Sequence, residues 1–97
     1  MSDFSSFLAE DRRGVILRVL DSVTSANDGV IQVTLEEIGH VVSLDVVRSD
    51  MHWLYEQGLV TVNVILGRVH VATITERGVD VARGRAVVPG IKPPPRG

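Results

Sequence analysis

The chain has 97 residues, no cysteine and a formal net charge of −2 at pH 7. This length fits one small domain with a modest core. Without cysteine, disulfides, thiolate zinc sites and cysteine nucleophiles are excluded, which fits a reducing cytoplasm. No apolar run approaches the roughly 20 residues of a membrane span, and the first residues lack the pattern of a signal peptide. We therefore expect a cytoplasmic protein that has no membrane partner.

The charges divide the chain into two parts. Residues 24–58 contain one arginine and six acidic residues, whereas residues 59–97 contain six lysines or arginines and two acidic residues. Because a net charge of −2 gives no general attraction to nucleic acid, any such attraction would come from the second part.

The first expected helix spans about Ser5–Val23, with apolar residues at three- and four-residue steps. Gly14 weakens this helix and allows another backbone to approach closely. We expect Arg12 and Arg13 on or near the face opposite the apolar stripe. The stripe comprises Leu8, Val15, Ile16, Val19, Leu20 and Val23.

The next segment combines turn, strand and helix signals. Thr24–Gly29 has the composition of a turn, and Val30–Val33 is a candidate strand that could pair with a later hairpin. Thr34 and Glu37 have the spacing of a capping box, in which each side chain accepts a hydrogen bond from the other residue's backbone N–H. A second helix is therefore expected over about Leu35–Val42.

A third helix is expected to begin after Ser43, a good N-cap, with Asp45 in its first turn to suit the helix dipole. Gly58 is expected to end it in a left-handed conformation. The spacing i, i+4, i+7 predicts that this helix buries Val47, Met51 and Leu54.

A hairpin and a short helix follow. Leu59–Ile65 and Val69–Thr73 are rich in β-branched residues and are separated by a short linker containing glycine, which is a hairpin signal. Thr75 is expected to cap a last helix over about Glu76–Arg83. We place the domain at residues 1–84. Residues 85–97 hold four prolines and are expected to form an extended or disordered tail.

Three helices, a two-stranded ribbon, a short C-terminal helix and an extended tail define an α+β fold, the winged helix-turn-helix. The stretch VVRSDMHWLYEQGLVTV, followed by the hairpin and TITERG, resembles the winged-helix pattern of many bacterial regulators. The chain is also similar to a small family encoded by Mu-like transposable phages and prophages. That similarity runs through DRRGVILRVL, GHVVSLDVVRSDMHWLYEQGLV and TITERGVDVARGRAVVPGIKPP. It implies a winged-helix protein of the phage morphogenesis region, acting in the bacterial host cell.

In DNA-binding winged helices, the third helix enters the major groove and the wing contacts phosphate or the minor groove. Asp45 and Asp50 would face or flank the DNA. The alternative is therefore a solvated or protein-contacting helix, with Arg48 paired to Asp45. The candidate DNA contacts are Ser43, Arg48, Ser49, His52 and Arg68.

Catalytic and metal sites are not expected. His40, His52 and His70 lack helical i, i+4 spacing and a joining carboxylate motif. Glu36 and Glu37 are helix neighbours and point apart. The expectation is a non-enzyme without cofactor or metal.

The tail has three alternative interpretations: a disordered end, a docking peptide that orders on a partner, or an arm that follows phosphates. Its candidate contact residues are Arg85, Val88, Pro89, Ile91, Lys92 and Arg96.

Two functional hypotheses follow. The first is a small, dimeric phage protein that binds double-stranded DNA in regulation, packaging or morphogenesis, with its dimer contact on the first or last helix. The second is a module that binds a phage or host protein on a winged-helix scaffold and does not bind DNA itself.

Overall fold

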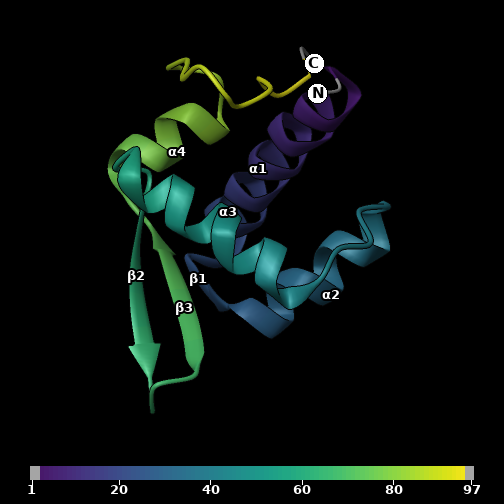
Figure 1. Cartoon of the computed structure of the whole chain (residues 1–97). Helices are drawn as coiled ribbons and strands as arrows, with labels where there is room; N and C mark the ends of the chain where they lie inside the picture. The colour runs from purple at the N-terminus through teal and green to yellow at the C-terminus, as the bar shows by residue number, and fades with distance from the viewer. Residues whose placement is uncertain (1–2, 96–97) are drawn as a thin grey trace.

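The computed structural model describes residues 3–95 and has four helices and a three-stranded antiparallel sheet (Figure 1). The helices gather at one end of a two-stranded ribbon that extends away from them. This α+β arrangement is consistent with a winged-helix-like fold. The elements in chain order are α1 (Asp3–Val23), β1 (Ser25–Asn27), α2 (Asp28–Ile38), α3 (Leu44–Glu56), β2 (Val60–Ile65), β3 (Val69–Ile74) and α4 (Glu76–Ala82).

The core lies where the helices meet the base of the ribbon. The predicted α3 stripe is confirmed, because Val47, Met51 and Leu54 are fully buried. The α1 stripe is confirmed in part, since Leu17 is also buried whereas Val23 is exposed. Other members of the core include Ile16, Leu20, Ile31, Leu35, Leu59, Val60, Ala72 and Val81.

Helix α2 begins earlier than expected. Asn27 is its N-cap and accepts a hydrogen bond from the Val30 N–H at 2.8 Å. Thr34 lies inside the helix, where its hydroxyl donates to the Val30 carbonyl. The predicted capping box and the predicted Val30–Val33 strand are therefore both wrong. The strand that pairs with the ribbon is β1, which lies in the segment expected to be a turn.

Helix α3 and the hairpin follow the prediction closely. Ser43 caps α3 by accepting from the Val46 N–H at 3.2 Å, and Gly58 has φ +77° just beyond the helix. The pairing of β2 with β3 runs without a break from Val60–Ile74 to Ile65–Val69. The strand order is β1-β3-β2, which makes β2 an edge strand.

Helix α4 packs tightly on the start of β2. Thr75 caps it, as expected, by accepting from the Gly78 N–H at 3.0 Å. A Cβ atom at Gly78 would lie 2.1 Å from the Leu59 carbonyl oxygen, so only glycine permits this approach.

The segment after α4 folds back along α1 (yellow in Figure 1). Val88 and Ile91 are buried in the core cluster, and the Lys92 N–H donates to the Glu10 carbonyl at 3.1 Å. A Cβ atom at Gly14 would lie 2.8 Å from the Lys92 carbonyl oxygen. The expected close backbone approach at Gly14 is confirmed, and the approaching segment is residues 85–95, which were expected to be extended or disordered.

Candidate functional site

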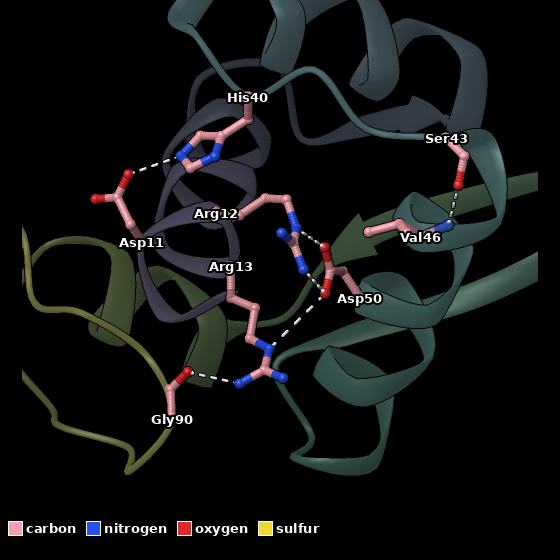
Figure 2. Close-up of polar contacts among 8 residues, drawn as sticks. All are labelled: Asp11, Arg12, Arg13, His40, Ser43, Val46, Asp50 and Gly90. Carbon is pink, nitrogen blue, oxygen red and sulfur yellow. Dashed lines mark hydrogen bonds and ion pairs between the residues drawn. The ribbon is translucent and has the colours of Figure 1, made fainter. Parts of the chain in front are cut away.

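The outward face of α3 is polar and carries more acid than base. Arg48 is the only lysine or arginine in this helix. The Ser43 hydroxyl, a candidate DNA contact, is already engaged in capping (Figure 2). The exposed residues along this face are Ser43, Asp45, Ser49, His52, Tyr55 and Glu56.

Arg48 is half-buried and is held by two other parts of the molecule. Its Nε donates to the Asp28 carboxylate at 2.8 Å, and a terminal nitrogen donates to the Arg68 carbonyl oxygen at 2.7 Å. The expected pairing with Asp45 is wrong, because Asp28 at the start of α2 takes that place. The Arg48 side chain thus ties α3 to α2 and to the turn of the wing.

Asp28 is a buried carboxylate that joins three elements. It accepts hydrogen bonds from Arg48, from the N–H of the adjacent Gly29 at 2.8 Å and from the His70 N–H on β3 at 3.3 Å. Burial raises the pKa of Asp28, but these hydrogen bonds outweigh it and the net pKa is lowered. Asp28 was expected to be a turn residue, and nothing in the local pattern predicted this role.

Asp50 is buried on the inner face of α3, at the centre of a charged cluster (Figure 2). Arg12 donates to both of its carboxylate oxygens, and the Arg13 Nε lies 3.8 Å from one of them. The expectation that Asp50 faces or flanks DNA is therefore wrong. Arg12 and Arg13 are also turned inward rather than onto the outer face of α1.

Arg13 extends this cluster to the C-terminal segment. Its terminal nitrogen donates to the Gly90 carbonyl oxygen at 3.0 Å, and its guanidinium lies 4.2 Å from the centre of the Trp53 ring. Gly90 itself packs against the indole, where a Cβ atom would clash. Trp53 therefore packs between α3, α1 and the C-terminal segment.

A second ionic group lies around Asp11. The His40 Nε2 is 2.7 Å from the Asp11 carboxylate, and the Lys92 Nζ is 3.7 Å from it (Figure 2 shows the His40 contact). The hydrogen bond with His40 lowers the pKa of Asp11. Lys92, a candidate tail contact, is thus engaged on the domain's own surface.

Most cations of the described chain are neutralised internally. Ten lysines and arginines occur in the sequence, and nine lie in residues 3–95 because Arg96 falls outside them. Three of the nine form no ion pair within these residues, namely Arg18, Arg68 and Arg77. The six paired residues are Arg12, Arg13, Arg48, Arg83, Arg85 and Lys92.

The other candidate residues lie in several places. Arg68 is exposed at the wing turn, close to Arg48, while Val88 and Ile91 are buried and Pro89 is exposed. Arg85 pairs with Asp80 at 3.0 Å on the α4 surface. The structure therefore brings Arg48 and Arg68 together, and separates both from the tail.

An apolar groove that no sequence pattern predicted lies between α1 and α2. Its volume is about 490 Å³. Arg18 is its only charged lining residue, and the apolar lining comes from Val15, Val19, Val23, Val30 and Ile38.

Residues 3–95 contain no group of three or more histidines and acids placed to hold a metal ion. Within the same residues, no helix has the length and apolarity required to cross a membrane.

Comparison with known proteins finds two relatives. The chain is 50% identical over 91 residues to the uncharacterized protein gp26 of Escherichia phage Mu, with 93% of this chain and 94% of that protein covered. It is 40% identical over 75 residues to an uncharacterized protein of Haemophilus influenzae, covering 76% of this chain and 74% of the relative. No protein-family model and no solved structure matches.

Proposed function

We propose that this chain, which belongs to a family of Mu-like phage proteins that includes gp26 of phage Mu, is a protein-interaction module on a winged-helix scaffold. In this proposal the exposed face of α3 binds a phage or host protein. The module performs no catalysis and uses no cofactor.

The observation that carries the proposal is the engagement of Arg48. A groove-reading helix needs cations or amides that are free to reach base edges and phosphates. Here the one arginine of α3 is bonded to Asp28 and to the wing backbone, and the exposed residues of the helix include Asp45 and Glu56. Such a face repels phosphate and suits a partner that presents basic or hydrogen-bonding side chains.

Direct DNA binding is the second candidate. It is supported by the winged-helix-like arrangement and by Arg68 and Arg77, which form no ion pair among residues 3–95. In this alternative the wing contacts the phosphate backbone and sequence reading by α3 is weak.

The reversal of one charge distinguishes the two candidates. Asp45→Lys should weaken capture of the partner from phage-infected cells, because it changes the α3 face. The same change should strengthen binding to a random duplex at low salt if that face meets DNA. Glu37→Lys, an equal charge change at an exposed site on α2, is the matched control.

We expect Asp45→Lys, but not Glu37→Lys, to lose the captured partner. We also expect the wild type to bind duplex DNA with a dissociation constant above about 100 µM. Micromolar binding to duplex that falls steeply with salt and is weakened by Arg68→Ala would instead establish the DNA alternative. An identical set of captured proteins for the wild type and Asp45→Lys would remove α3 from the proposal.

A further inference from the structure

The floor of the apolar groove between α1 and α2 is formed by one stripe of side chains from each helix. Every fourth residue takes part, so each stripe follows its helix for about 12 Å, or roughly two turns. Val23, Val30 and Ile38 in this floor are 55%, 50% and 55% exposed, so the groove is open along its length. The stripes are Val15, Val19 and Val23 on α1, and Val30, Thr34 and Ile38 on α2.

The two rims of the groove carry charges of opposite sign. On the α1 side, Arg18 lines the groove next to Val19. On α2, Ile31 and Leu35 are buried in the core, so helical periodicity places Glu37 on the other side of the groove stripe, where it is exposed. Neither Arg18 nor Glu37 forms an ion pair within residues 3–95. An occupant therefore meets an unpaired cation on one side and an unpaired carboxylate on the other.

We propose that this groove binds an amphipathic helix of a partner protein. The helix lays an apolar stripe on the floor, with residues at i, i+3 or i+4, and i+7. Its flank toward α1 carries acidic residues that meet Arg18, and its flank toward α2 carries basic residues that meet Glu37.

Shape and charge favour a helix over other occupants. A convex helix fills a concave groove, whereas the same groove of a second copy would leave a void between the two floors. Small-molecule sites enclose most of their ligand, and this groove is open. A lone carboxylate amphiphile would also satisfy Arg18 and leave Glu37 without a role.

Three synthetic peptides test the proposal. Each has about 18 residues, the same leucine stripe and alanine elsewhere, because shorter helices are marginal in water. The mixed peptide has glutamate on one flank and lysine on the other, the acidic peptide has glutamate on both, and the basic peptide has lysine on both. Fluorescence anisotropy at low salt would measure their dissociation constants.

The wild type should bind the mixed peptide about fivefold more tightly than either of the others. Arg18→Glu makes both rims acidic, so the basic peptide should become the tightest. Glu37→Lys makes both rims basic and should favour the acidic peptide. Because the same three peptides are used throughout, differences in their own helicity cannot reverse the order.

Glu36→Lys is the matched charge control. Glu36 is exposed on the side of α2 that faces away from the groove stripe, so this variant should keep the wild-type order. Val30→Asn, on the groove floor, should raise the dissociation constants of all three peptides about fivefold or more. Val41→Asn, at a 74% exposed position beyond the end of α2, should leave them unchanged.

The absence of peptide binding at about 1 mM would overturn the proposal, as would an order of affinities that Arg18→Glu and Glu37→Lys do not change. Binding of decanoate that needs Arg18, without binding of any peptide, would identify a small carboxylate as the ligand and also overturn it.

This inference is independent of the proposed function, since it concerns α1 and α2 and not the outward face of α3. Asp45→Lys should leave peptide binding unchanged, and Glu37→Lys should keep the partner of the α3 face. Either site can therefore fail its test without affecting the other.

Discussion

Leu66 occupies a backbone conformation that suits asparagine or glycine better than leucine. Its φ is +53°, Gly67 follows at +68°, and the Arg68 N–H donates to the Ile65 carbonyl at 3.1 Å. Two successive positive φ values are typical of a type I′ turn, for which Asn-Gly is the strongest sequence. Leucine in this position is strained by about 1 kcal/mol, and its side chain is 86% exposed, so packing does not compensate.

We therefore predict that Leu66→Asn stabilises the fold by about 1 kcal/mol. Urea unfolding monitored by circular dichroism would measure the change as a higher midpoint with an unchanged slope. Leu66→Val is the comparison: a β-branched residue is still worse at positive φ, so it should destabilise. If Leu66→Asn lowers the midpoint, the side chain contributes to stability in a way that its exposure conceals.

Among the elements, α3 and the wing were predictable because their signals are local. Ser43, Gly58 and Thr75 each act within a few residues of their own positions. Helix α2 was not predictable in this way. Its cap at Asn27 is as local as the others, but the spacing of Thr34 and Glu37 offered a competing start. The preceding strand β1 is defined by pairing with a strand more than 40 residues later.

The charged side chains were misjudged for the same reason. The partner of Asp50 is 38 residues away on α1, and the partner of Arg48 is 20 residues away at the start of α2. Ion pairs at such separations are set by tertiary packing and leave no periodic signal. Helical spacing alone therefore favoured the nearer pair, Arg48 with Asp45.

Gly14 gives a test of how the C-terminal segment is held. Gly14→Ala should displace residues 85–95, because the added Cβ would lie 2.8 Å from the Lys92 carbonyl oxygen. The expected signs are faster tryptic cleavage after Arg85 and a red shift of Trp53 fluorescence, since Gly90 packs on the indole. We expect a net loss of stability of about 1–2 kcal/mol despite the better helix propensity of alanine.

Gly29→Ala is the control for this change. Gly29 is also helical, but its added Cβ would be 3.5 Å from its nearest neighbour, an ordinary contact. This variant should leave cleavage after Arg85 unchanged and raise stability by up to about 1 kcal/mol. Similar proteolysis of both variants would show that Gly14 does not position the segment.

At the scale of the whole molecule, two carboxylates, one buried and one half-buried, make stability depend on pH. The pKa values of Asp28 and Asp11 are lowered below the ordinary value of 3.8. The folded state therefore binds fewer protons than the unfolded state, and the free energy of unfolding falls as the pH falls. The contribution of these groups is fully present well above pH 3.8 and is lost as the pH drops through the lowered values.

Asp28→Asn should lower stability by about 2 kcal/mol at neutral pH, because the half-buried Arg48 loses the charged carboxylate that it contacts. It should also flatten the decline of stability below about pH 5. Thermal unfolding from pH 7 to pH 3 would measure both effects. Glu37→Gln, on an exposed side chain of α2, is the control and should retain the wild-type slope. If the stability of Asp28→Asn declined with falling pH as steeply as that of the wild type, Asp28 would not be the source of the pH dependence.

The contacts of Arg48 also determine what a binding partner meets. The same side chain is bonded to Asp28, which in turn accepts from β3, and to the carbonyl at the wing turn. The angle between α3 and the ribbon is thus set before any encounter. A partner that touches both elements meets a preorganised surface, so little conformational entropy is lost when the complex forms. Arg48→Ala should accordingly slow association and increase the unfavourable entropy of binding, even for a partner that never contacts the arginine.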